Sequence, residues 1–159
     1  MADSVRERIM KNVQAALQAI TVANGYSVTL NSVDRILQQG QTLSPPMAIL
    51  AEGTDDVVSG GPLSGANGLI ARELTVAVRL VVQQDTDSDS RSASEVLNGV
   101  LADAQKKMQE DYSRGGLAVN TEEVGVEPIQ MEEGVPVIYL DAMFKIHYRH
   151  SRVDPTIAG

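Results

Sequence analysis

Two long segments of this chain alternate apolar and polar residues with a period of two, and this alternation constrains the fold more than any other feature. Successive side chains of a β-strand point to opposite faces, so each segment predicts a strand with one face against a core. Both segments exceed the usual strand length, and the first is long enough to extend beyond its sheet as one arm of a long β-hairpin. In residues 69–83 the apolar face carries Leu74, Val76, Val78, Leu80 and Val82. In residues 135–150 it carries Ile138, Leu140, Ala142, Phe144, Ile146 and Tyr148.

Two further segments place apolar residues at helical spacing and predict amphipathic helices. Ser4 with Glu7 opens the first helix, over residues 4–21, and Ser92 with Glu95 opens the second. Both pairs fit the capping box, in which the side chains of the first and fourth residues bind each other's backbone N–H groups. The first apolar stripe is Val5, Ile9, Val13, Ala16, Leu17 and Ile20. The second is Ala93, Val96, Leu97, Val100, Leu101, Ala104 and Met108.

Weaker signals predict three more strands, over residues 26–36, 47–51 and 117–130. No strand is followed by a Gly-rich phosphate-binding turn, and the two helices are too few for a doubly wound parallel sheet. The order of elements therefore predicts an α+β fold, with an antiparallel or mixed sheet and both helices on one of its faces. The length of 159 residues suits a single domain, 1–159, with a short mobile tail at 151–159.

Residues 53–68 are rich in glycine and predict a long flexible loop. Loops of this length are functional or disordered, so two interpretations stay open: a disordered hairpin tip, or an arm that becomes ordered against a neighbouring subunit. The glycines that would give the arm its freedom are Gly53, Gly60, Gly61, Gly65 and Gly68.

The composition disfavours nucleic-acid binding and membrane insertion. The formal charge is −8, and an acidic surface repels phosphate. One Phe, four Tyr and no Trp offer few rings for stacking bases. There is no Cys, so thiolate metal ligands are absent. No apolar stretch approaches the length of a membrane span.

No motif in the sequence predicts a catalytic, cofactor or metal site. Residues 85–89 resemble the start of a calcium loop, but Ser90 and Val96 stand where that loop needs Gly and Glu. His147 and His150 are three residues apart on one predicted strand, which puts them on opposite faces and prevents them from sharing an ion. The pairs of adjacent glutamates diverge on a strand, whereas catalytic carboxylates must converge.

The second face of each long strand predicts an interaction surface. It mixes charged residues with apolar ones, a composition that suits packing between subunits, and a lone sheet would leave its edges exposed. The candidate residues on these faces are Ala77, Arg79, Val81, Tyr139, Met143 and Arg149, to which the five arm glycines are added.

The chain resembles the tail terminator (tail completion) proteins of long-tailed bacteriophages. The likeness is diffuse, covers nearly the whole chain and rests on four features. These are the opening helix at residues 4–9, the Pro-marked strand at 45–50 followed by the Gly-rich arm, the long strand and helix from Leu74 to Met108, and the last strand at 144–150 that exits into a tail with Asp154 and Pro155.

The resemblance implies a non-enzymatic virion subunit that is made in the host cytoplasm. Such a subunit forms a ring, usually of six copies, on the head-proximal end of the tail tube. The ring stops tube growth and offers a surface to the head–tail connector, while DNA passes through the lumen without specific binding. Two alternatives stay open: a connector or neck protein, and a small oligomeric α/β enzyme with a site between subunits.

Overall fold

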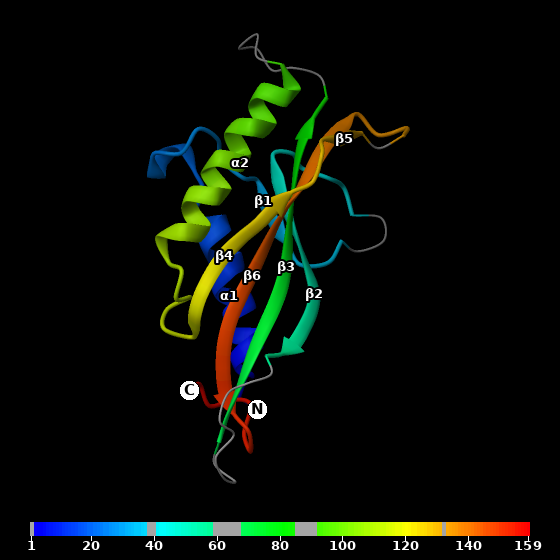
Figure 1. The fold of residues 1–159 in the computed structure, drawn as a ribbon. Coiled ribbons are helices and arrows are strands. Elements are labelled where there is room, and N and C mark those ends of the chain that lie inside the picture. Colours follow the sequence, from blue (N-terminus) through cyan, green and yellow to red (C-terminus); the bar gives the residue numbers. More distant parts are fainter. Residues whose placement is uncertain (1, 38–40, 59–67, 85–91, 132) are drawn as a thin grey trace.

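The computed structural model of the chain describes residues 2–37, 41–58, 68–84, 92–131 and 133–159. Within these ranges the chain forms two α-helices, one short 3-10 helix and a six-stranded mixed sheet (Figure 1). The elements are α1 (Val5–Gln18), η1 (Val22–Asn24), β1 (Ser32–Asp34), β2 (Met47–Val57), β3 (Leu69–Gln83), α2 (Ala93–Glu110), β4 (Ala118–Val126), β5 (Gln130–Met131) and β6 (Val137–Ser151).

The two long strands predicted from the alternation pair with each other at the centre of the sheet. β3 and β6 are antiparallel, and their register runs without a break from Leu69 opposite Ser151 to Gln83 opposite Val137. The strand order is β1-β2-β3-β6-β4. β5 pairs with the first residues of β6, and β1 is parallel to β2. This arrangement confirms the predicted α+β fold with a mixed sheet.

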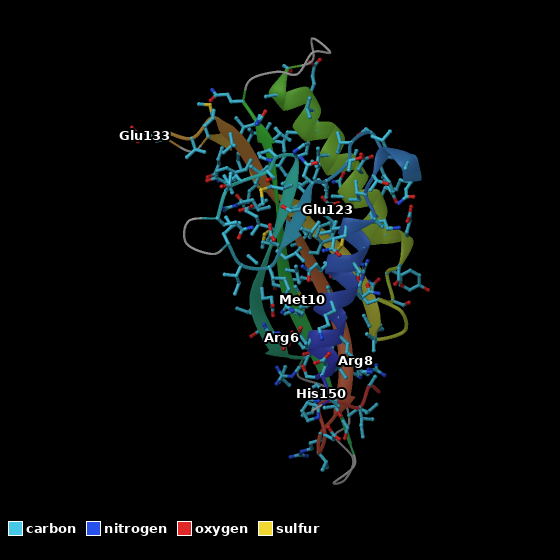
Figure 2. The ribbon with its side chains drawn as sticks, turned by 180° about the vertical axis from the view of Figure 1, so that it is seen from behind. Arg6, Arg8, Met10, Glu123, Glu133 and His150 are labelled. Atoms are coloured by element: carbon cyan, nitrogen blue, oxygen red, sulfur yellow. The ribbon has the colours of Figure 1, made fainter. Side chains whose placement is uncertain are left out.

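Both helices pack on one face of the sheet, which we call the inner face. Figure 2 shows α1 crossing this face, whereas Figure 1 views the opposite, outer face, on which no described helix lies. The apolar faces predicted for β3 and β6 meet the helical stripes in a single core, and Phe144 at its centre is fully buried. An aliphatic core of this kind stabilises the fold by burying apolar surface, about 25 cal/mol per Å².

The helix starts follow the sequence pattern. The Ser4 hydroxyl accepts a hydrogen bond from the Glu7 N–H at 3.1 Å, and Ser92 and Glu95 form the complete capping box. The first helix ends at Gln18, before the predicted residue 21, and η1 continues the turn to Gly25 at a φ of 85°.

The strand predicted over residues 26–36 is much shorter than expected, since β1 covers only Ser32–Asp34. The reason lies in Ser27, whose N–H and hydroxyl both donate to the Asp103 carboxylate, at 2.8 and 2.5 Å. A backbone N–H that binds a helix side chain is not available to a strand ladder. Residues 26–30 therefore cross the core as irregular chain.

The predicted loop at 53–68 is wrong at its start. β2 continues to Val57 and pairs with β3 as far as Arg72, past a bulge between Glu52 and Asp55. Gly68 directly precedes β3, and its carbonyl accepts from the Arg152 N–H at 2.9 Å. Residues 59–67, which hold Gly60, Gly61 and Gly65 and would form the tip of the predicted arm, lie outside the described residues.

Hydrogen bonds join the tail at 151–159, for which the sequence predicts mobility, to the rest of the fold. The Val5 N–H donates to the Pro155 carbonyl at 2.9 Å, and the Arg8 guanidinium donates to the Thr156 carbonyl at 2.6 Å. The tail thus closes over the N-terminal turn of α1.

Candidate interaction surface

The outer sheet face collects most of the predicted interaction residues. Cross-strand neighbours share a face of a sheet. Ala77 lies opposite Met143, and Arg79 lies opposite Asp141, at the middle of the β3–β6 ladder. Arg149 lies on the same face, opposite Ala71 near the end of the ladder. The alternation of β3 and β6 was sufficient to predict this grouping.

Arg79 is fixed in place from two sides. Its Nε and one terminal nitrogen each lie 2.8 Å from an oxygen of the Asp141 carboxylate, which makes a bidentate ion pair. The guanidinium carbon also lies 4.3 Å from the centre of the Tyr139 ring. Planar, bidentate contacts hold an arginine in one geometry and leave less conformational entropy to be lost when a partner docks.

A second set of charged groups lies on the same face, farther along β6, and extends over three strands, β3, β6 and β4. The Lys145 ammonium lies 2.6 Å from Glu73, and His147 Nε2 lies 3.0 Å from the Glu122 carboxylate on β4. The hydrogen bond from Lys145 lowers the pKa of the Glu73 carboxyl, and the same bond raises the pKa of Lys145. Positive and negative groups therefore alternate across the face, without a field of one sign.

Val81 is a correction to the predicted surface. It is only 3% exposed, because it forms a small apolar cluster with Met47 and Val137 on the outer face. Leu43, from the segment before β2, packs against this cluster. Val81 therefore has almost no surface to offer to a partner. The alternation within β3 could not predict this burial, because it depends on Leu43 and other residues outside the strand.

Gly53 also differs from its predicted role. A Cβ placed on it would lie 3.2 Å from both the Cβ and the carbonyl oxygen of Thr75. At this bulge the glycine allows β2 and β3 to approach closely, as glycine does where two backbones meet. The sequence analysis singled out Gly53 but predicted that it makes the arm flexible.

Sequence reasoning missed an ion-pair network on the inner face, at the N-terminal end of α1. Arg6 lies 2.9 Å from Glu52 of β2, and Arg35 joins Glu52 to Glu7 of α1, with 2.7 Å to Glu7. Hydrogen bonding from Arg35 lowers the pKa of Glu7. Four charged groups from α1, β2 and the residue after β1 thus form ion pairs with one another, which a search for separate motifs does not reveal.

The same network continues to Asp55, Arg72, Tyr148 and His150. The Tyr148 hydroxyl donates to Asp55 at 2.8 Å, and burial together with this bond raises the pKa of Tyr148. Arg72 Nε donates to His150 Nε2 at 3.1 Å, while His150 Nδ1 donates to the Ser151 carbonyl at 2.7 Å. Both ring nitrogens are engaged, so we assign His150 a structural role. Its side chain is buried.

Arg114 is another residue that the sequence did not single out. Its side chain is fully buried in the turn after α2, where it donates to the Met108 carbonyl and, at 3.1 Å, to the Thr121 hydroxyl. Burial lowers the pKa of its guanidinium. The contacts close the C-terminal end of α2 onto β4, so we assign the residue a role in stability.

The described residues contain no group of three or more His, Asp or Glu side chains placed to hold a metal ion. His147 and His150 lie on opposite faces of β6, as predicted. The calcium-like run at 85–89 is outside the described residues. Across the same described ranges, no helix is long and apolar enough to cross a membrane.

Comparisons with known proteins give no family for the chain. No family model matches it, and no curated protein matches it in sequence.

Proposed function

We propose that this chain is a structural subunit that assembles through its outer sheet face, and that it serves as a tail terminator on a phage tail tube. The observation that supports assembly is the face itself. No described helix covers it, and the charged side chains at its centre are already paired with each other, as Arg79 is with Asp141. A surface whose polar groups are satisfied before docking can be covered without leaving unpaired charges.

The two edges of the sheet differ, and this difference favours assembly into a ring. β4 is one edge strand, and on the other side β1 covers only Met47–Ile49 of the eleven-residue β2. The rest of β2 and the whole outer side of β4 have no strand partner among the described residues. Different surfaces on opposite sides of one subunit suit a heterologous contact, which closes into a ring when its rotation allows.

The charge of the chain suits the passage of DNA through such a ring. A net charge of −8 gives like-charge repulsion toward phosphate, so the duplex would move through the lumen without being held. The partners in this proposal are further copies of the chain, the tail tube protein below the ring and the head–tail connector above it. The resemblance to tail terminators supports this choice among the structural roles.

Electron microscopy of growing tail tubes tests the proposal. Purified chain is added to tube protein during polymerisation, and tube lengths and ends are compared with a reaction that lacks the chain. We expect shorter tubes that carry a ring at one end. Tubes of unchanged length with bare ends would rule out the terminator role. A chain that ignored tubes but bound the connector would instead identify it as a neck protein.

A further inference from the structure

The long sheet separates two ends of the molecule that differ in charge. β6 has 15 residues, which at about 3.4 Å per residue extend about 50 Å. One end of β6 carries the turn that joins it to β5, and the other carries the tail at 151–159 (Figure 1). Each end exposes apolar side chains beside charged ones.

The acidic end carries Ile129, Met131 and Glu133, and Glu127 precedes it along the chain, where its N–H donates to the Asp141 carbonyl at 2.8 Å. Both carboxylates are exposed, and neither pairs with a cation among the described residues. Figure 2 shows Glu133 projecting from the tip of the β5–β6 turn. Ile129 is 42% and Met131 69% exposed, a high value for large apolar side chains that lie close together.

The same end has a hollow that opens to solvent. Its volume is about 530 Å³, and its lining combines Met131, Val135 and Pro136 with the carboxylate-bearing Glu133. A hollow with apolar walls and an acidic rim fits an apolar side chain that is followed or preceded by a cation.

The basic end consists of Arg149, Arg152, Val153 and Ile157. Both arginines are exposed, and neither has a carboxylate partner in the part of the chain that the structure describes. Val153 is 69% and Ile157 55% exposed. The one acidic side chain within this stretch is Asp154. Its carboxylate accepts from the Thr156 N–H at 2.9 Å and from the Thr156 hydroxyl at 2.7 Å.

We infer that two copies of this chain dock end to end, with the basic end of one on the acidic end of the next. Both halves of the complementary pair are present on a single chain, so a second copy satisfies them without another partner. Arg149 and Arg152 would face Glu127 and Glu133, and Val153 or Ile157 would enter the hollow beside Met131. Copies that each carry a charge of −8 repel one another in general, which restricts attraction to this orientation.

The contact is heterologous, so each pair of docked copies retains one free acidic and one free basic end. Association should therefore continue beyond a dimer as the concentration rises. The contact is small and its charges are exposed to solvent, so we expect weak and salt-sensitive binding. The inference does not depend on the proposed function, because of the predicted outer-face residues it uses Arg149 alone, at the end of the ladder, and not the middle of that face around Ala77.

Sedimentation velocity over a range of concentrations tests the association. The smallest species, whether one chain or a ring, should associate at 50 mM salt, and its apparent dissociation constant should rise at least about tenfold at 500 mM salt. A single species at every concentration up to about 1 mM, or association that salt does not weaken, would overturn the inference.

A charge exchange gives the decisive test. The double variant Arg149→Glu/Arg152→Glu has two acidic ends, and Glu127→Arg/Glu133→Arg has two basic ends. Each alone should lose association, an equimolar mixture should regain it, and the control Lys106→Glu on α2 should behave as the unmodified chain. A mixture that stays dissociated, or single variants that associate normally, would refute end-to-end docking. Circular dichroism verifies that each variant is folded.

Ring formation is tested separately by Ala77→Arg on the outer face, so the two proposals can fail independently.

Discussion

The guanidinium of Arg79 and the carboxylate of Asp141 face each other across the two central strands and make two hydrogen bonds of 2.8 Å. The Arg79 side chain is 43% exposed and that of Asp141 17% exposed. The pair therefore orders the outer face more than it stabilises the fold. Its geometry is set by the unbroken β3–β6 register, which places the two residues directly opposite each other.

A double-mutant cycle on Arg79→Ala and Asp141→Ala measures the interaction of the pair. Because water screens the charges, we expect a coupling free energy of about 1 kcal/mol in urea unfolding, reduced further at high salt. A coupling above about 3 kcal/mol would mean that the pair behaves as a buried one, contrary to its exposure.

Gly53→Ala should destabilise the protein, because the new methyl would lie 3.2 Å from two atoms of Thr75. The strands must separate slightly, at a cost of about 1–3 kcal/mol in the free energy of unfolding. Gly125→Ala in β4 is the matched control. Nothing lies within 4 Å of its added Cβ, so this change should be neutral or stabilising by up to about 1 kcal/mol. Equal effects at the two sites would show that Gly53 has no packing role.

Arg114→Ala should lower the free energy of unfolding by about 3 kcal/mol, because it leaves the buried Met108 carbonyl without its donor. Arg114 also has a φ of 52°, which costs a non-glycine residue about 1 kcal/mol. Arg114→Gly loses the same hydrogen bonds but relieves this strain, so it should be the less destabilised of the two.

The exposed Arg149→Ala serves as the control for Arg114, with an expected change within about 0.5 kcal/mol. The account of Arg114 would be wrong if Arg114→Ala unfolded at the same denaturant concentration as that control.

The Glu7–Arg35 pair predicts a loss of stability in acid. The pKa of Glu7 is lower in the folded chain than the value of about 4.3 expected when unfolded. Its contribution is therefore present above pH 4.3 and is lost as the pH falls through the folded pKa. Glu7→Gln should make the decrease in stability between pH 5 and pH 3 smaller. Glu133→Gln, at an exposed position with no cation partner among the described residues, should leave the decrease unchanged, and urea titrations at each pH compare the three proteins.

Periodicity correctly predicted the elements in which the spacing of the apolar residues alone defines the buried face. The bounds of β3 match residues 69–83, and α2 begins after the capping box of Ser92 and Glu95. In both cases the apolar side chains that face the core recur at one regular spacing. The fold class followed because two helices and several strands of this kind have few ways to cover each other.

Contacts between distant segments explain what the sequence did not reveal. β2 extends through residues 53–57, despite the glycine and the three polar residues among them, because Gly53 lets the strand bulge against β3. Val81 is buried because side chains from other segments, Leu43 and Val135 among them, pack against its cluster. Arg114 is buried because Met108 and Thr121 supply acceptors from two different elements. None of these relations has a local signature in the chain.

Co-sedimentation with tail tubes tests most directly whether the outer sheet face drives assembly. Ala77 lies at the middle of that face, and Ala77→Arg would place a long charged side chain where a neighbour must approach. Asn98→Arg, on the exposed side of α2, is the control. We predict that the unmodified chain and Asn98→Arg pellet with tubes equally, while Ala77→Arg remains folded but binds at least about tenfold less. Equal recovery of Ala77→Arg with the tubes, or failure of the unmodified chain to pellet with them, would contradict the account.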